Sequence, residues 1–322
     1  MKRFLAILLC ICTLTSLTGC QRTVSSEPIS VQDMLFDTII SIKIWGTDDT
    51  ALLDHCIEMC KKYEQTLSRT IPDSEISQIN NAGGSPVKVS EETAAVIKKG
   101  LEYGDLSDGR FDITIAPLSI LWDFKNNTGV VPSETDITEA RSHVNYKNVT
   151  VDGNTVTLSD PKAAIDLGGI AKGYIADQLK KYLESKNVTS GLISLGGNIV
   201  TIGSKIDGSD FNIGIQKPFD EQNSAITSVQ VSDKSVVSSG VYERYFKVDD
   251  KLYHHILNPS TGYPYDNNLL EVTILSEQSV DGDALSTTCF AMGLEEGMAL
   301  IDSMDGIEAI FVTDDYELHY TN

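Results

Sequence analysis

Apolar and polar positions alternate along the chain with two distinct periods, one typical of helices and one typical of strands. Residues 52–67 and 91–103 place apolar side chains every three to four positions, which predicts two amphipathic helices. Ser90 precedes the second of these and is the expected N-cap. Further helices are predicted for residues 136–144, from Gly169 to about residue 184, and for residues 280–292 and 294–303.

Alternating or β-branched stretches predict the strands, the first of them over residues 34–45. Hairpins are expected at 149–158, turning at Asp152-Gly153-Asn154, and at 242–257, turning at Asp249-Asp250. Other strands are predicted for residues 163–166, 191–203, 211–216, 226–231, 271–275, 307–312 and 316–320. Helices and strands mix without a regular βαβ order. This indicates an α+β fold. We expect residues 34–322 to form one catalytic unit, and a division of this unit into two lobes stays open.

The N-terminus has the parts of an export signal. Met1-Lys2-Arg3 is basic, residues 4–16 are apolar but too few to span a bilayer, and Leu17-Thr18-Gly19-Cys20 resembles a bacterial lipobox. We predict a signal peptide over residues 1–19, lipidation of Cys20, and a tether over residues 20–33. The alternative is an ordinary secretory signal in which Cys20 is incidental. Lipidation would hold the protein at the extracytoplasmic face of the bacterial cell membrane.

Composition and charge exclude some classes of function. The 322 residues are 41% hydrophobic and 22% charged, which is typical of a globular protein. A formal net charge of −21 excludes nucleic-acid binding through a broad basic face. The same charge would be repelled by anionic lipid, so the membrane is reached only through a lipid anchor.

The cysteines give no sign of a disulfide framework. Cys56, Cys60 and Cys289 remain after the predicted signal and Cys20, and this count is odd. Cys56 and Cys60 lie one helical turn apart beside His55, so a metal cluster is conceivable. Both also fit the apolar stripe of their helix, and core packing is the preferred interpretation.

Four segments carry candidate chemistry, and the first is Ile165–Asp177. A predicted strand meets a helix across Gly168-Gly169, and Lys172 falls in the first helical turn. Exposed N–H groups, the helix dipole and the lysine together would suit a phosphate. A tight turn that needs glycine for steric reasons explains the spacing equally well.

The second segment is Ser194–Asn198, with a paired glycine after a strand. Gly196 and Gly197 would let the backbone approach a ligand closely. Taken alone, a β-bulge is the preferred interpretation.

The third segment runs from Tyr253 to Pro264 and contains two of the five histidines of the chain. In a strand, His254 and His255 point to opposite faces, so at most one of them faces a given site. That histidine could be a general acid or base, or it could be structural.

The fourth segment is Asp281–Thr287. On a helix, Asp283 and Thr287 are four positions apart and share one face. A carboxylate and a hydroxyl suit a hard cation such as Mg²⁺, which keeps phosphate and water ligands. The alternative is an acidic helix start that favours the dipole.

The order of these segments resembles the ApbE family of FAD:protein FMN transferases, which are often lipoproteins. The resemblance covers about residues 34–312. Further matching motifs are Leu67-Ser68, Ser74-Glu75-Ile76 with Asn80, Gly109–Thr114, Pro117-Leu118 with Trp122, and Ser238–Arg244. The family fold is ApbE-like (T-fold-like), with mixed sheets and packed helices.

The resemblance implies a set of site residues. Mg²⁺ would be held by Asp283, Thr287 and the carbonyl of Ala171. The FAD pyrophosphate would bridge this ion and the turn, and the predicted cofactor-binding residues are Asn80, Asp112, Asp166, Gly168, Gly169, Lys172, Gly196, Gly197, Asn198, Ser239 and His255. The segment from Gly214 to Pro218 would line the nucleotide pocket, and Asn80 and Asp112 would lie near the flavin ring.

The resemblance also implies an activity. A Thr or Ser hydroxyl of an exported acceptor flavoprotein, within an Asp-x-x-Ser/Thr-Gly-Ala-Ser/Thr motif, would attack the FMN phosphorus of FAD and release AMP. His255 or Asp283 would take the proton, and the sequence leaves both open. The alternatives are an Mg²⁺-dependent FAD pyrophosphatase giving FMN and AMP, a non-catalytic flavin-binding lipoprotein, and a structural surface lipoprotein.

Overall fold

The computed structural model describes residues 27–126, 128–220, 222 and 224–322. Among these residues, no helix is both long enough and apolar enough to cross a bilayer. The predicted signal peptide and Cys20 lie outside the described residues. The predicted tether is shorter than expected, because Ile29 already begins the first strand and the folded domain starts before residue 34.

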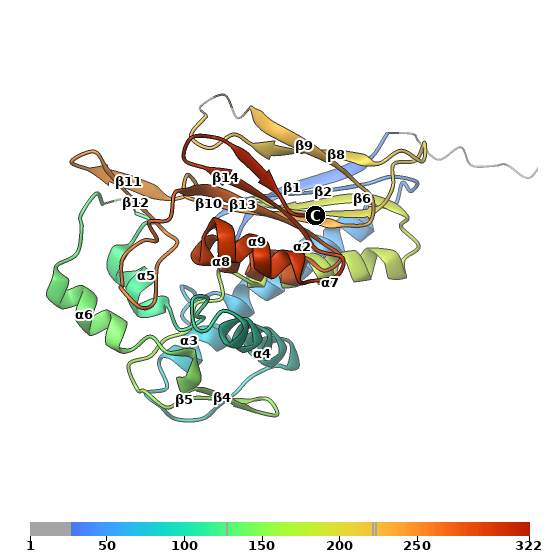
Figure 1. Cartoon of the computed structure of the whole chain (residues 1–322). Coiled ribbons are helices and arrows are strands. Elements are labelled where there is room, and N and C mark those ends of the chain that lie inside the picture. The colour runs from blue at the N-terminus through green and yellow to red at the C-terminus, as the bar shows by residue number, and fades with distance from the viewer. Residues whose placement is uncertain (1–26, 127, 221, 223) are drawn as a thin grey trace, which may run out of the picture.

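An eight-stranded sheet forms the centre of the fold (Figure 1). Every neighbouring pair of its strands is antiparallel. The strands lie in the order β1 (Ile29–Leu35), β2 (Thr38–Ile44), β6 (Ser190–Leu195), β7 (Asn198–Gly203), β10 (Ser235–Gly240), β13 (Leu269–Ser276), β14 (Glu308–Thr313) and β15 (Leu318–Tyr320). All eight residues of β13 are buried, since both faces of the sheet are covered at this strand.

Helices cover one face of the sheet and a hairpin covers the other (Figure 1). The helical layer consists of α2 (Ala51–Leu67), α7 (Ala171–Ser185), α8 (Ser279–Met292) and α9 (Leu294–Asp302). The hairpin of β8 (Phe211–Gln216) and β9 (Ala225–Val231) buries an apolar face with Ile213 and Ile215 against Val236 and Leu275. Burial of these aliphatic faces from water is what holds the layers together.

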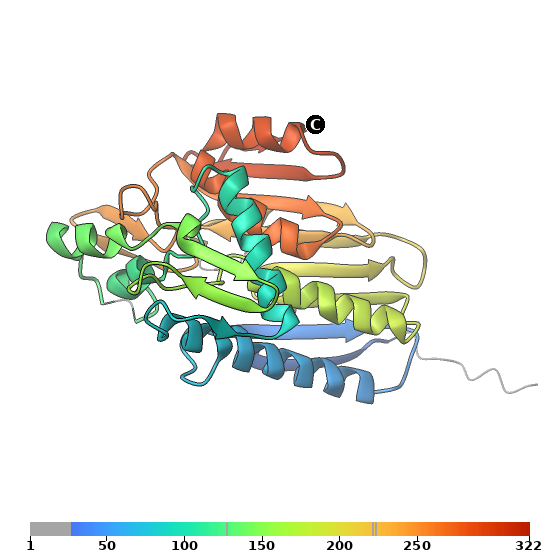
Figure 2. The ribbon, with the colours of Figure 1, turned by 90° about the horizontal axis from the view of Figure 1, so that it is seen from below.

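A further layer lies beyond the helices, as Figure 2 shows from below. It contains α3 (Glu75–Asn80), α4 (Glu91–Leu106), the 3₁₀ helix η1 (Tyr146–Asn148), and a small sheet of β3 (Val87–Lys88), β5 (Thr155–Leu158) and β4 (Val149–Asp152). The Tyr103 hydroxyl of α4 donates to the Asp281 carboxylate of α8 at 2.7 Å, which ties this layer to the helices.

A second apolar cluster sits at one end of the molecule, and we call it the aromatic lobe. Its elements are α5 (Ala116–Trp122), α6 (Glu134–Ser142), β11 (Tyr245–Val248) and β12 (Lys251–His254). Its buried side chains are Leu118, Trp122, Phe124, Ile137, Phe246 and Leu257. The indole N–H of Trp122 donates to the carbonyl of Gly262 at 2.8 Å.

Most of the long predicted helices and strands are present, with shifted ends. The Ser90 hydroxyl accepts the N–H of Thr93 and caps α4 as predicted. Cys56 and Cys60 are fully buried in the core, which confirms the packing interpretation. No group of three or more histidine, cysteine or acidic residues that could hold a metal occurs in the described part of the chain.

Two predicted strands are in fact hairpins. The stretch 34–45 is broken at Phe36 and Asp37, whose φ values of 56° and 59° turn β1 into β2. The stretch 191–203 is broken by Gly196 and Gly197, which join β6 to β7. Both breaks are two-residue turns inside apolar runs, so periodicity alone passes over them.

Other local predictions were wrong. Residues 163–166 form no strand, and only Ala164 makes an isolated bridge, to Ile115. The sequence analysis missed α3, α5, β3 and β10. The helices α3 and α5 are too short to show a helical period. In β10, the adjacent serines Ser238 and Ser239 interrupt the apolar pattern of a strand.

The two central helices α7 and α8 touch at Gly173. A Cβ at this position would lie 2.3 Å from the Ser279 carbonyl oxygen and 2.7 Å from the Cα of Val280. Such contacts are closer than van der Waals packing allows, so only glycine fits between the helices.

Gly173→Ala is expected to lower the free energy of unfolding by about 1–3 kcal/mol, because the methyl group must push α7 and α8 apart. This outweighs the higher helix propensity of alanine, about 1 kcal/mol. Urea denaturation measures the change. Lys181→Ala, at an exposed position of the same helix, is the control. A Gly173→Ala protein as stable as wild type would contradict the close contact.

Glu271 interrupts the apolar run of β13 and is fully buried. Burial raises its pKa to about 7, and the nearby Glu243 carboxylate adds to this. Hydrogen bonds from Ser238, Tyr242 and Thr273 lower the pKa but do not cancel the effect of burial. The folded protein therefore holds a proton on Glu271 up to about neutral pH.

The unfolded chain loses this proton near the ordinary pKa of 4.5. The contribution of Glu271 to the free energy of unfolding of the wild type therefore falls as pH rises from 4.5 to about 7. Glu271→Gln cannot ionise, so its stability relative to wild type should increase by up to about 3 kcal/mol between pH 4 and pH 8. Urea denaturation at both pH values tests this, with the exposed Glu317→Gln as control. A difference that is the same at both pH values would contradict a raised pKa.

Candidate active site

Asp283 lies where α8 meets the start of α7. The residue is 3% exposed, and its Oδ2 accepts the backbone N–H of Gly173 at 2.8 Å. Its Oδ1 lies 3.9 Å from the Nζ of Lys172. A carboxylate therefore already occupies the positive end of the α7 dipole.

Thr287 lies one turn further along α8 and is half-buried. Its hydroxyl is 3.2 Å from the hydroxyl of Ser239 on β10, which in turn is 2.7 Å from the hydroxyl of Ser286. A Cβ on Gly169 would lie 3.6 Å from the Thr287 hydroxyl oxygen. The fold thus brings the glycine turn, the start of α7, one face of α8 and β10 together.

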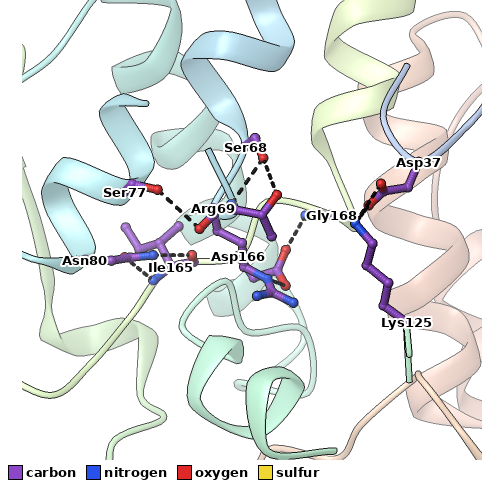
Figure 3. A network of polar contacts seen from close by, with 10 residues as sticks. Asp37, Ser68, Arg69, Ser77, Asn80, Lys125, Ile165, Asp166 and Gly168 are labelled. Carbon is purple, nitrogen blue, oxygen red and sulfur yellow. Dashed lines mark hydrogen bonds and ion pairs between the residues drawn. The ribbon is translucent and has the colours of Figure 1, made fainter. Parts of the chain in front are cut away.

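The glycine turn is closed by its own acidic residue (Figure 3). Asp166 Oδ1 accepts the N–H of Gly168 at 2.9 Å, and its Oδ2 accepts the Nε–H of Arg69 at 2.6 Å. The N–H groups of Ile170 and Ala171 both bond to the carbonyl of Leu167.

This arrangement changes the expected phosphate site. The amides of Gly168 and Gly173 are already bonded to the carboxylates of Asp166 and Asp283, so they do not form an open cradle. A phosphate placed beside both carboxylates would be repelled. A cation between phosphate and carboxylate removes that repulsion.

Asn80 and Asp112 use their polar atoms to hold backbone. The Asn80 amide donates to the carbonyl of Ile165 at 2.9 Å and accepts the N–H of the same residue at 2.7 Å (Figure 3). The Asp112 carboxylate accepts from the N–H and hydroxyl of Thr114 and from the N–H of Tyr146. Both residues shape the walls around the turn, and their contact with a flavin stays a prediction.

Gly196 and Gly197 form the two-residue turn between β6 and β7. Their φ values of +59° and +83° are those of a hairpin turn with both central residues left-handed, so the preferred bulge interpretation was wrong. A Cβ on Gly196 would lie 2.4 Å from the hydroxyl oxygen of Thr38. Asn198 follows the turn, is fully buried, and accepts the Ser279 hydroxyl at 2.6 Å.

The segment after β8 reaches the same end of the sheet. The ring of Phe219 lies 6.2 Å from that of Tyr242 and 5.0 Å from that of Tyr245. Gly214 itself lies on the exposed side of the β8–β9 hairpin. Whether this segment lines a nucleotide pocket stays a prediction.

The two histidines have different surroundings, as their alternation predicts. His254 is buried, its Nε2 lies 2.8 Å from the carbonyl of Tyr265, and its Nδ1 accepts the N–H of Ile256. His255 is half-buried, and its buried Nδ1 has no hydrogen-bond partner among the described residues. His254 is therefore structural, and His255 has a ring nitrogen left over.

His255 is neutral at physiological pH. Its pKa is lowered to about 3, mainly by burial and to a smaller extent by the nearby His254, Arg244 and Lys172. Of these three charged or polar neighbours, Lys172 contributes least. A neutral imidazole has a lone pair that can accept a proton, and a pKa this low makes His255 a weak base.

Three residues of this region escaped the sequence analysis. Arg69 gives no periodic or compositional signal. Asp177 lies one helical turn after Gly173, so helix geometry places both residues on the same face of α7, and this pattern could have drawn attention to Asp177. Glu271 stands as a lone acid within the apolar run of β13.

The predicted metal ligands are chemically suited to Mg²⁺. Asp283 offers a carboxylate, Thr287 a hydroxyl and Ala171 a backbone carbonyl, and all three are hard oxygen donors. Mg²⁺ binds through one or two carboxylates and keeps water or phosphate oxygens as its other ligands. A site with a single acidic side chain fits that preference.

Comparisons with known proteins bear on this arrangement. The sequence profile of the ApbE family matches residues 36–311. The FAD:protein FMN transferase of Klebsiella pneumoniae is 38% identical over 287 residues, covering 88% of this chain and 89% of the relative. That of Treponema pallidum is 29% identical, covering 95% and 90%.

Solved structures agree with the sequence relatives. The ApbE protein of Thermotoga maritima has a TM-score of 0.84 and 31% identity, covering 92% of this chain and 97% of that one. The flavin transferase ApbE of Vibrio cholerae has a TM-score of 0.82 and 28% identity, with the same coverage. The expected α+β fold is confirmed, and the chain belongs to the ApbE family.

Proposed function

We propose that this protein is an FAD:protein FMN transferase, which moves FMN from FAD to a hydroxyl group of another protein. The observation that carries the proposal is the meeting of Asp283, Thr287 and Lys172 with the glycine turn. Family membership and the names of the relatives, matched over about nine-tenths of their length, support the same activity.

Mg²⁺ is proposed as the cofactor, held by Asp283, Thr287 and the carbonyl of Ala171. Bound there, it would neutralise negative charge on the pyrophosphate and on the leaving AMP. The repulsion between a phosphate and the carboxylates of Asp166 and Asp283 supports the need for such a cation. Lys172 adds a fixed positive charge beside Asp283.

The reaction we propose is a substitution at the FMN phosphorus of FAD. The hydroxyl oxygen of the acceptor forms the new P–O bond, the P–O bond to the AMP phosphate breaks, and AMP leaves. His255 takes the hydroxyl proton. Asp283 is less suited to this, because its Oδ2 accepts the Gly173 N–H and its Oδ1 faces Lys172.

The proposed acceptor is an exported flavoprotein with the motif Asp-x-x-Ser/Thr-Gly-Ala-Ser/Thr. We further propose that the protein is anchored by lipid on Cys20 at the extracytoplasmic face of the membrane. The basic start, the apolar segment and the lipobox-like Leu17–Cys20 support this location.

Asp283→Ala is expected to lower FMN transfer more than about 100-fold, because it removes the only acidic metal ligand proposed. The assay incubates protein with FAD, Mg²⁺ and an acceptor domain bearing the motif, and follows AMP release and acceptor mass. Asp305→Ala, at an exposed position after α9, is the control and should keep full activity.

The same assay distinguishes the alternatives. AMP and free FMN without acceptor labelling would replace the transferase by an FAD pyrophosphatase. FAD binding without any AMP release would leave a non-catalytic flavin-binding protein, and a lack of FAD binding would leave a structural lipoprotein.

Cys20→Ala is expected to abolish labelling of the protein by radioactive palmitate and to release it from the membrane fraction. The physical reason is that two acyl chains supply enough buried methylene groups for stable anchoring, and no other membrane attachment is proposed. Cys289→Ala is the matched control. A Cys20→Ala protein that still sediments with membranes would contradict the anchor.

A further inference from the structure

We propose that Asp177 is a positioning residue that holds the Asp283 carboxylate in place, through an exchange of N-terminal caps between α7 and α8. The geometric part of this proposal stands on contacts within the chain. Its consequence for metal binding rests on the proposed function.

Neither helix caps its own N-terminus. The N-cap residues are Ile170 for α7 and Gln278 for α8, and neither makes a side-chain cap hydrogen bond. The first N–H groups of a helix have no partner within the helix, so they need one from outside when they are buried.

Each helix receives its cap from the other. Asp177 of α7 accepts the N–H groups of Ser279 and Val280 of α8, at 2.8 Å and 2.9 Å. Asp283 of α8 accepts the N–H of Gly173 of α7, at 2.8 Å. Each carboxylate also lies at the positive end of the partner helix dipole.

The two caps are mechanically linked. Gly173 and Asp177 are one turn apart on α7, and Ser279 and Asp283 are one turn apart on α8. The backbones touch between them, where a Cβ on Gly173 would lie 2.3 Å from the Ser279 carbonyl oxygen. A shift of one helix along the other would therefore break both caps at once.

The central sheet also holds the start of α8. The Ser279 hydroxyl donates to Asn198 of β7 at 2.6 Å, and Asn198 follows the Gly196-Gly197 turn directly. The start of α8 is thus held by α7 on one side and by the sheet on another. Without Asp177, the N–H groups of Ser279 and Val280 would lose their acceptor, while the Ser279 hydroxyl would still donate to Asn198.

The functional consequence concerns the free oxygen of Asp283. One carboxylate oxygen is bonded to Gly173, which leaves Oδ1 directed towards Lys172 and the proposed metal position. Asp177 touches neither the metal nor FAD in this arrangement. Loss of a residue that orients a metal ligand lowers metal affinity by about 10- to 100-fold.

The first test measures hydrogen exchange at the Gly173 amide without metal, on the whole chain in detergent. In Asp177→Asn, the side-chain oxygen can still accept the N–H of Ser279. The side-chain NH₂ group then faces the N–H of Val280, and two donors cannot form a hydrogen bond. We expect exchange at Gly173 to become about ten-fold faster, as for the loss of a helix cap. Glu184→Gln, an exposed charge change on the same helix, should exchange like wild type.

Global unfolding is measured in urea for each variant, and its contribution to exchange is subtracted. If Asp177→Asn does not fold, Asp177→Ser takes its place, because serine keeps one short acceptor for Ser279. Exchange at Gly173 equal to wild type after this correction would overturn the inference, whatever the protein does with Mg²⁺.

The second test titrates Mg²⁺ and follows the melting temperature. We expect the Mg²⁺ concentration at half-effect to rise about 10- to 100-fold in Asp177→Asn. In an Asp283→Ala background, Asp177→Asn should cause no further change, because it acts through Asp283. A further loss in that background would contradict this route.

The two tests separate the two proposals. Fast exchange at Gly173, in a protein whose wild type shows no response to Mg²⁺, would refute the metal site and keep the role of Asp177. A normal response of wild type and Asp177→Asn to Mg²⁺ would refute the role of Asp177 and keep the metal site.

Discussion

The close contact between α7 and α8 at Gly173 is the constraint on which the candidate site depends. Backbones that touch leave room for nothing larger than a glycine, so the relative position of the two helices is fixed to within a fraction of an ångström. The proposed metal ligands come from both helices. Their geometry is therefore set by packing between helices, and not by a flexible loop.

Electrostatics around the glycine turn differ from those of a common phosphate-binding loop. In such loops, free N–H groups at a helix start face the phosphate directly. Here Asp166 and Asp283 already bind the amides of Gly168 and Gly173. These two amides are therefore not available to a phosphate, and the cation proposed above would offset the charge of the two carboxylates together with Arg69 and Lys172.

The sequence predicted the parts of the fold that repeat. Long amphipathic helices such as α2 and α4 show several turns of the same pattern, and the shared face of Asp283 and Thr287 follows from helix geometry alone. The turns at Phe36-Asp37 and Gly196-Gly197 consist of two residues each, which is too short to show a period, so the sequence did not predict them. Partners distant in sequence escaped as well, since nothing local links Arg69 to Asp166 or Asp177 to Ser279. The roles of Asn80 and Asp112 as backbone supports could only be read from three-dimensional contacts.

The turn at Phe36-Asp37, at the edge of the sheet, contacts the segment that follows α5 of the aromatic lobe. Asp37 accepts from the Nζ of Lys125, which follows α5, at 2.7 Å and 2.8 Å (Figure 3). Both side chains are about half exposed, and a pair of this kind contributes under about 1 kcal/mol. Thermal energy is enough to open it, and dissolved salt weakens it further. The segment after α5 is therefore attached to the β1–β2 turn by a contact whose strength depends on the ionic strength of the surrounding solution.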